Sequence, residues 1–290
     1  MKVLVTGGTG FVGPYVVRAI QDAGHDVRAL VRKGSLPGAE TAQGDMTDAA
    51  SLRRAVDGVD AVVHLVAIRQ GKQAQFQRIM VDGTRDLLAA ACEASVGRFV
   101  HMSALGTSEE TKDLVPYYRA KWLQEGLVRG SRLEHVVFRP SFVFGTDGGI
   151  LPTFRRLAKI APVTPIIGSG KQRIQPIWVD DVAAYFARAL DEPDATNRTF
   201  EVGGPDVVSW NEFWTRLKRA LGVRRPSLHV PMAFMRANAL VTERLPGDIP
   251  LTRDLLKMLE HGDNVVTNND AVETFGLPLV PLDEQLRRAA

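Results

Sequence analysis

The chain has 290 residues but only one cysteine, Cys92, and six histidines, none of which stands at metal-ligand spacing from another. A single thiol cannot form an internal disulfide or a zinc knuckle, so we expect neither a disulfide framework nor a metal site. Cys92 falls in an alanine-rich stretch typical of a helix, and we expect it to be a buried, unreactive thiol.

Long apolar runs and a strong net charge are missing as well. No apolar run approaches the length needed to cross a bilayer, and no charged leader precedes the first strand, so we expect a cytoplasmic protein without a transmembrane segment. The chain carries 36 Lys and Arg against 33 Asp and Glu, a net charge of +3, and its basic residues do not alternate with aromatic ones. A nucleic-acid partner is therefore not expected, although this charge balance leaves room for a local basic pocket that binds a phosphate.

The composition that remains is that of a globular protein, with 45% hydrophobic and 24% charged residues. A chain of this length is long for one compact domain and short for two full ones. We expect a larger domain over residues 1–145, with strands returning from about residues 172–203, and a smaller part over residues 146–290. The motifs that follow indicate dinucleotide binding for the first and substrate binding for the second.

The N-terminal stretch carries the most informative motif. Residues 2–6 are apolar and β-branched, as in a strand, and the apolar spacing of residues 11–20 suits a helix buried on one side. Gly7, Gly10 and Gly13 lie at the junction. Gly7 can take a tight turn, Gly10 lets the backbone approach a diphosphate, and Gly13 lets the helix sit against the strand. The alternative is a loop that needs glycines for its shape alone.

Strand-like and helix-like stretches continue to alternate along the first half of the chain. Apolar strands are expected at residues 25–31, 60–67, 98–104 and 134–139, with helices at residues 49–56 and 73–94 between them. This alternation predicts an α/β fold, a Rossmann-type doubly wound parallel sheet with a small α+β C-terminal substrate domain.

The end of the second strand bears on the choice of cofactor. In this architecture that position meets the adenosine ribose, where a carboxylate favours NAD and a basic residue suits the 2′-phosphate of NADP. Here Arg32 and Lys33 follow Val31, and no carboxylate is present. We therefore expect NADP, with NAD as the alternative; the other interpretation is that both residues are only solvated loop charges.

Tyr117 and Lys121 form the candidate catalytic pair. They are four residues apart at the start of a predicted helix, so they share one helical face. Reduction of a carbonyl needs a proton donor, and a phenol serves when an ammonium and the nicotinamide charge stabilise its phenolate. The alternative is an exposed pair on a packing helix.

These motifs resemble a known superfamily. Thr-Gly-Gly-Thr-Gly-Phe-Val-Gly at residues 6–13 is similar to the Thr-Gly-x-x-Gly-x-x-Gly turn of short-chain dehydrogenases/reductases, which also carry a Tyr-x-x-x-Lys pair. Arg-Pro-Ser-Phe-Val-Phe-Gly at residues 139–145 is similar to a segment of their extended members. The match runs from Lys2 to about Leu221. It is most similar to the branch of the nucleotide-binding accessory subunit of respiratory complex I.

The resemblance implies the site residues. Catalysis would use Tyr117 and Lys121, with Ser103 as a substrate hydrogen-bond donor, and Asp45 would contact the adenine amino group. The full set of implied cofactor contacts is Thr6, Gly7, Thr9, Gly10, Phe11, Val12, Gly13, Arg32, Lys33, Asp45, Met46, Leu65, Val66, Ala67, Lys121 and Pro140. The chain departs from the family pattern at Met80, where the family has asparagine, and at Ala104, where one alignment puts the catalytic hydroxyl.

Three functions follow. The first is an NAD(P)H-binding oxidoreductase that reduces a carbonyl or similar group of a small molecule. The second, favoured by Met80 and Ala104, is a non-catalytic nucleotide-binding assembly or sensor protein, and the third is a nucleotide-sugar epimerase or dehydratase. A homo-oligomer or a protein complex is left open.

Four further local expectations concern side chains and segments beyond these motifs. His101 is expected in the core, Asp180 or Asp181 is expected to cap a helix, and residues 162–170 are expected to form a loop. The apolar stretch 231–241 is core, a substrate-facing helix or an interface, with core favoured.

Overall fold

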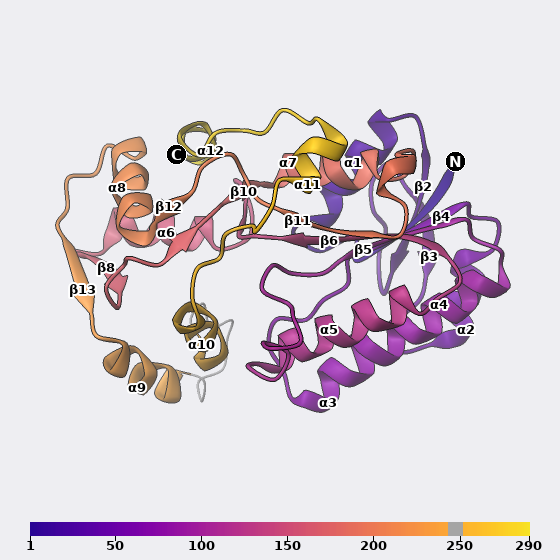
Figure 1. The fold of residues 1–290 in the computed structure, drawn as a ribbon, viewed down its shortest axis with the longest axis horizontal. Helices are drawn as coiled ribbons and strands as arrows, with labels where there is room; N and C mark the ends of the chain where they lie inside the picture. Colours follow the sequence, from indigo (N-terminus) through magenta and orange to yellow (C-terminus); the bar gives the residue numbers. More distant parts are fainter. Residues whose placement is uncertain (243–251) are drawn as a thin grey trace. The chain divides into compact units, whose positions relative to one another are not determined.

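The computed structural model describes residues 1–242 and 252–290 and consists of two compact units (Figure 1). Unit 1 comprises Met1–Pro140, Val179–Val202 and Thr267–Pro278. Unit 2 comprises Ser141–Trp178, Gly203–Val266 and Leu279–Ala290. The C-terminal part expected from the sequence, residues 146–290, includes residues 243–251, which lie outside the described residues.

A seven-stranded parallel sheet forms the centre of unit 1. Its strands, in spatial order, are β11 (Arg198–Val202), β6 (Glu134–Pro140), β5 (Arg98–Met102), β4 (Ala61–His64), β1 (Lys2–Thr6), β2 (Asp26–Val31) and β3 (Glu40–Gln43). The chain order reverses between β1 and β4, whose last residues, Thr6 and His64, are paired in register. Ligands of open α/β sheets bind where the order reverses, at the carboxyl ends of the strands.

Helices cover both faces of this sheet, as the sequence predicts for a doubly wound fold (Figure 1). The helices on one face are α1 (Gly13–Asp22), α7 (Val179–Arg188) and α11 (Asp270–Phe275). Those on the other face are α2 (Ala49–Val56), α4 (Gly83–Glu93) and α5 (Pro116–Arg129). A short 3-10 helix, Pro193–Ala195, precedes β11.

The long helix expected over residues 73–94 is present in three consecutive parts. α3 (Gln73–Gln75) leads into the π-helical turn η1 (Phe76–Asp82), which continues into α4. A Cβ at Gly83 would lie 2.6 Å from the backbone oxygen of Met46, so only glycine allows this close approach of α4. Cys92 lies on α4 and is exposed, so the expectation of a buried thiol is wrong.

The N-termini of α2 and α7 test the expectation that acidic residues cap these helices. Asp48 caps α2, because its Oδ1 accepts from the N–H groups of Ala50 and Ser51 at 3.0 and 3.3 Å. α7 begins at Val179, so Asp180 and Asp181 lie in its first turn, where their charge favours the helix dipole. The expectation that one of them occupies the cap position is therefore wrong.

Unit 2 is built from short strand pairs and helices around its own apolar core. The pairs are β7 (Val143–Phe144) with β10 (Ile177–Trp178), β8 (Thr164–Ile167) with β13 (Ser227–Val230), and β9 (Arg173–Ile174) with β12 (Val208–Ser209). The helices are α6 (Leu151–Ile160), α8 (Trp210–Ala220), α9 (Met232–Thr242), α10 (Arg253–His261) and α12 (Leu282–Ala289). The loop expected over residues 162–170 contains β8, because β13 provides a partner from far along the chain.

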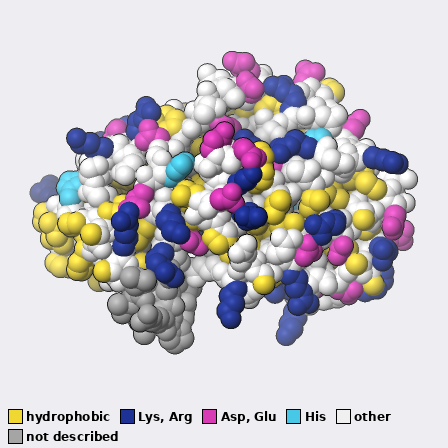
Figure 2. All heavy atoms as spheres, turned by 60° about the horizontal axis from the view of Figure 1, so that its bottom comes forward, with side chains coloured by type: hydrophobic (Ala, Val, Ile, Leu, Met, Phe, Trp, Pro, Cys, Tyr) yellow, Lys and Arg dark blue, Asp and Glu magenta, His cyan; other side chains and the backbone are white. Residues whose placement is uncertain are grey.

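No helix in the described ranges is both long and apolar enough to cross a membrane. On the face drawn in Figure 2, Lys and Arg side chains lie among Asp and Glu side chains and do not merge into one basic stripe.

Candidate active site

The glycine turn between β1 and α1 has a separate structural reason for each glycine. Gly7 has a φ of +79°, a conformation that favours glycine, and its Cβ position lies 3.0 Å from the backbone of Leu65 and Val66. A Cβ at Gly13 would lie 2.4 Å from the backbone of Gly8, which no side chain could accept. Gly10 is exposed, and its Cβ position meets only the Gly7 oxygen at 3.3 Å.

This turn fits a dinucleotide diphosphate. The space beside Gly10 is open, and the N–H groups of Phe11 and Val12, at the start of α1, make no backbone hydrogen bond with a described residue. Free N–H groups at a helix N-terminus bind phosphate oxygens, with the helix dipole adding to the attraction. Thr9 is exposed on the same turn.

Arg32 and Lys33 follow β2 directly and are both exposed. Neither forms an ion pair with a residue that the structure describes. Asp45 lies nearby: its Oδ1 accepts from the N–H and the hydroxyl of Thr47 at 2.8 and 2.7 Å. These hydrogen bonds, together with the charges of Arg32 and Arg78, hold the pKa of the Asp45 carboxyl below its ordinary value. An ionised carboxylate close enough to Arg32 to feel its charge is suited to an adenosine bearing a phosphate.

The remaining implied cofactor residues differ in exposure. Val66 and Ala67, after β4, are partly exposed and exposed, whereas Leu65 is 8% exposed. Met46 is buried in the core against Gly83. Two further residues are hydrogen-bonded within the protein. Thr6 Oγ1 lies 2.7 Å from His64 Nδ1, and the main-chain oxygen of Pro140 accepts from the Leu105 N–H at 2.9 Å.

Tyr117 and Lys121 share one face of α5, as the sequence predicts. Lys121 Nζ lies 6.0 Å from the centroid of the Tyr117 ring. The Lys121 side chain is 1% exposed, and its ammonium donates to the main-chain oxygen of Met102, at the end of β5, across 2.6 Å. Burial lowers the pKa of Lys121 to about 7, although the negative charge of Glu125 opposes the shift. The ammonium is therefore held at the carboxyl edge of the sheet.

The pKa of Tyr117 moves opposite to the sequence argument, which expected Lys121 to lower it. Burial raises the pKa of the phenol above its ordinary value, Tyr118 adds to the rise, and Arg69 opposes it. The Tyr117 ring packs against Phe76 and Met80 of η1, which explains the low polarity around it. Without a bound cofactor, Tyr117 is therefore a protonated phenol at neutral pH.

Ser103 is buried and faces Glu125. Its hydroxyl donates to Glu125 Oε1 at 2.5 Å, and Arg139 forms a bidentate pair with the same carboxylate at 2.8 and 2.7 Å. Arg129 adds a third contact at 2.9 Å. Burial would raise the pKa of Glu125, but the hydrogen bonds and charge of Arg139, with help from Ser103 and Arg129, outweigh it and lower the pKa. Ser103 thus joins β5 to α5 through an ionised carboxylate.

His64 organises a second buried network beneath Lys121. Thr84 Oγ1 donates to the Met80 oxygen at 2.5 Å, so it must accept from His64 Nε2, which lies 2.8 Å away. His64 Nδ1 then accepts from Thr6. Burial, followed by the charge of Lys121, lowers the pKa of His64 to about 3, so its ring is neutral. Gln124 completes the network by donating to Thr84 Oγ1 at 2.7 Å.

Several polar residues of this region were not identified from the sequence. Gln124 and Glu125 follow Lys121 by three and four residues, and that helical spacing was the available signal. His101 is buried and stacks on His64 with ring centroids 5.3 Å apart, which confirms its predicted core position.

The two positions that depart from the family pattern differ in burial: Met80 is fully buried, and Ala104 is partly exposed just after β5. No group of three His, Cys, Asp or Glu suited to a metal ion occurs among the described residues.

Comparison with known proteins assigns the family. The model of the NAD dependent epimerase/dehydratase family matches residues 3–203. The chain belongs to this family. Family members are NAD(P)-dependent oxidoreductases and epimerases. The family match and the parallel sheet with helices on both faces confirm the predicted superfamily and fold.

Relatives that match nearly the whole chain include two that represent different activities. One is the mitochondrial NADH dehydrogenase [ubiquinone] 1 alpha subcomplex subunit 9 of Rattus norvegicus, 28% identical over 98% of this chain and 79% of the relative. The other is the 2-alkyl-3-oxoalkanoate reductase of Stenotrophomonas maltophilia, 26% identical over 99% of this chain and 98% of the relative. The similarity to the complex I subunit agrees with the branch that the sequence motifs indicate.

Solved structures show the same fold. The triphenylmethane reductase of Citrobacter sp., complexed with NADP(H), superposes with a TM-score of 0.79 at 19% identity, over 99% of this chain and 100% of that one. Two other solved structures with this fold contain NAD: a short-chain dehydrogenase/reductase superfamily protein from Agrobacterium tumefaciens and the enzyme WbmH of Bordetella bronchiseptica. Structural neighbours thus bind either dinucleotide.

Proposed function

We propose that this protein is an NADPH-dependent reductase that converts the carbonyl group of a small molecule to an alcohol. The observation that carries the proposal is the arrangement on α5: the phenol of Tyr117 and the buried ammonium of Lys121 lie on one helical face, with Nζ 6.0 Å from the ring. The relative named 2-alkyl-3-oxoalkanoate reductase supports the reaction class, since its named substrate contains a ketone.

The raised pKa of Tyr117 keeps its phenol in the protonated form that the proposed reduction needs. A phenol that stays protonated at neutral pH can donate its proton from Oη to the carbonyl oxygen as the substrate is reduced. NADPH, when bound, would supply the hydride for the carbonyl carbon. Lys121 would hold the ribose hydroxyls and would stabilise the negative charge left on Tyr117 Oη. The proposal gives Ser103 no catalytic role, because its hydroxyl is bonded to Glu125.

Binding of NADPH rests on residues of unit 1. The open space at Gly10 and the N–H groups of Phe11 and Val12 would hold the diphosphate, and the unpaired Arg32 and Lys33 would hold the 2′-phosphate. Asp45 would accept from the adenine amino group.

The test compares two neighbouring tyrosines. The purified protein is mixed with NADPH and a panel of alkyl ketones, 3-oxo esters and quinones, and NADPH consumption and alcohol formation are followed. For any compound that is reduced, Tyr117→Phe should lower kcat by about 10²–10⁴-fold with little change in NADPH affinity. Tyr118→Phe is the matched control, since its hydroxyl donates only to the Leu105 oxygen at 3.3 Å. Equal turnover in Tyr117→Phe and wild type would overturn the proposal.

A second function is favoured by one observation. Ser103, expected to donate to a substrate, and Lys121, expected to hold the nicotinamide ribose, are each hydrogen-bonded to the protein itself, and the partly exposed position after β5 is Ala104. A non-catalytic nucleotide-binding assembly or sensor protein, similar to the complex I subunit among the relatives, needs no such groups. That function predicts NADPH binding with no reduction of any compound in the panel.

A further inference from the structure

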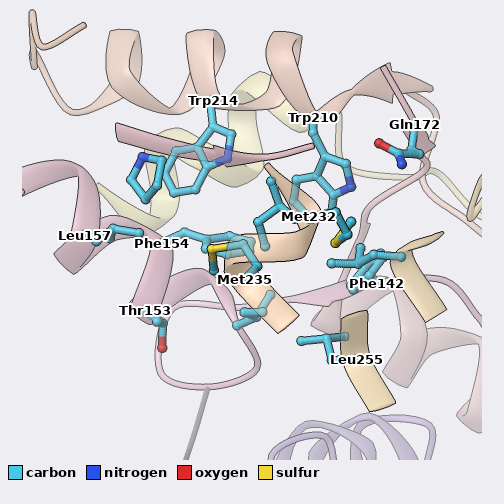
Figure 3. Close-up of a pocket in the computed structure, with 14 residues that line it drawn as sticks. Phe142, Thr153, Phe154, Leu157, Gln172, Trp210, Trp214, Met232, Met235 and Leu255 are labelled. Atoms are coloured by element: carbon cyan, nitrogen blue, oxygen red, sulfur yellow. The ribbon is translucent and has the colours of Figure 1, made fainter. Parts of the chain in front are cut away.

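Unit 2 contains an apolar pocket that none of the sequence motifs indicates (Figure 3). The pocket has a cavity volume of about 160 Å³ and is lined from α6, α8, α9 and α10. All of its lining residues belong to unit 2, so the pocket is defined by this unit alone.

One wall of the pocket is aromatic and rigid. Phe154 packs edge-on against Trp210, with ring centroids 5.6 Å apart, and contacts Trp214 at 5.0 Å. Phe142 meets Trp210 at 5.6 Å in the same edge-on manner. Trp210 and Trp214 both project from α8, one helical turn apart, and are 9% and 4% exposed (Figure 3). Interlocked rings of this kind present a rigid apolar surface.

The side of the pocket formed by α9 and α10 is also apolar, and its methionine side chains can change conformation. Met232 and Met235 come from α9, and Leu255 comes from α10. Methionine side chains adapt to irregular shapes, so this side can follow ligands of different outline. An ion pair between Arg236 and Glu260, 2.6 Å apart, joins α9 to α10 through residues that do not line the pocket.

The lining contains no charged side chain. Of its 14 residues, Thr153 and Gln172 are the polar ones with hydrogen-bonding side chains besides the indoles. A diphosphate or carboxylate taken into such a site would lose its hydration without gaining an Arg or Lys partner, at a high free-energy cost. The Gln172 side-chain amide has no hydrogen-bond partner among the described residues, so it can bond one polar group of a ligand.

We propose that this pocket binds an uncharged, largely hydrocarbon small molecule, with a flat ring against Phe154, Trp210 and Trp214 and one polar group at Gln172. The chemistry excludes a nucleotide sugar from this site. The proposal goes beyond the reductase function and does not depend on it, because binding is measured with neither NADPH nor turnover.

The test uses the neutral fluorophore N-phenyl-1-naphthylamine as probe. Tryptophan excitation of the full chain should produce naphthylamine emission that saturates, since Trp210 and Trp214 line the pocket. Met235→Lys, which puts a charge into the lining, should weaken probe binding at least tenfold. Phe234→Lys is the matched control on the same helix, because Phe234 is 63% exposed and lies outside the lining. It should change binding less than twofold.

Competition then tests the ligand class. A small neutral aryl ketone such as acetophenone, whose size suits a cavity of about 160 Å³, should displace the probe, and UDP-glucose should not. Equal binding in Met235→Lys and wild type, equal weakening by both lysine variants, or displacement by UDP-glucose would each overturn the proposal. Thermal unfolding of both variants confirms that a loss of binding does not reflect a loss of folding; should Met235→Lys unfold, Met235→Gln with the same readouts replaces it.

Discussion

Lys121 donates to the main-chain oxygen of Met102 across 2.6 Å, which fixes an ammonium at the carboxyl end of β5. The same burial that positions the ammonium lowers its pKa to about 7. The burial of Lys121 therefore determines both where its ammonium lies and the pH at which it loses its proton.

The first prediction concerns pH. Lys121 carries its charge below pH about 7 and loses it above that value, so kcat/KM for NADPH should fall at higher pH with a slope approaching −1. The free energy of unfolding should rise between pH about 7 and the ordinary lysine value of 10.5, because there the unfolded chain binds a proton that the folded protein does not. Both effects should be absent in Lys121→Met. A pH profile that this variant leaves unchanged would show that another group titrates.

The second prediction separates the two roles of the glycine turn. Gly10→Ala should fold with nearly unchanged Tm but bind NADPH at least about 100-fold more weakly, because its methyl group enters the space meant for the diphosphate. Gly13→Ala should lower the free energy of unfolding by about 1–3 kcal/mol or more, since its methyl group would overlap the Gly8 backbone. Thermal unfolding without nucleotide and NADPH titration give the two readouts. Tight NADPH binding by Gly10→Ala would contradict the assignment.

The third prediction concerns the choice between dinucleotides. Arg32→Ser should weaken NADPH binding about tenfold to hundredfold, the value of a charge-assisted hydrogen bond to phosphate, and leave NADH affinity unchanged. The control is Arg132→Ser. Arg132 is exposed and precedes β6, so it lies at the amino ends of the strands, whereas Arg32 lies at their carboxyl ends. Calorimetric titration with both dinucleotides measures the effect. Equal losses for NADPH and NADH would argue that Arg32 does not meet the 2′-phosphate.

The fourth prediction concerns the buried carboxylate. Glu125→Gln should lower the free energy of unfolding by about 3–5 kcal/mol, because it leaves the Arg139 guanidinium without its charged partner. The exposed Glu134→Gln on β6 is the matched control and should stay within about 0.5 kcal/mol.

Acid provides a second readout for Glu125. Its pKa is lowered on folding, so its contribution to stability is complete above the ordinary value of 4.5 and is lost as the pH falls through the lower folded value. Urea unfolding between pH 3 and pH 7 should therefore show a weaker acid dependence in Glu125→Gln than in wild type. The same acid dependence in both would mean that Glu125 is not ionised in the folded protein.

The sequence predicts the parts of the fold that local patterns determine. The glycine turn, the cap at Asp48 and the strands of unit 1 follow from residue spacing within short windows, and the structure confirms them. β8 was missed because it is stabilised by β13, about sixty residues away, and its proline content is typical of a loop.

Side-chain direction was harder to predict than backbone structure. A strand alternates its faces, and the sequence does not say whether Ser103 or Ala104 faces the crevice. The outcome depends on Glu125, which lies twenty-two residues further on and attracts the Ser103 hydroxyl. The exposure of Cys92 likewise depends on which face of α4 meets the sheet.

Unit 1 is assembled from three separate stretches of the chain. Its last piece carries Phe275, whose ring lies 5.5 Å from Phe138, 5.4 Å from Tyr185 and 5.2 Å from Phe200. During synthesis, this aromatic cluster cannot close until residue 275 has left the ribosome, long after the first strands have emerged. The face of the sheet that carries Phe138 and Phe200 is therefore the last part of unit 1 to be covered, and it stays open until the C-terminal stretch has been made.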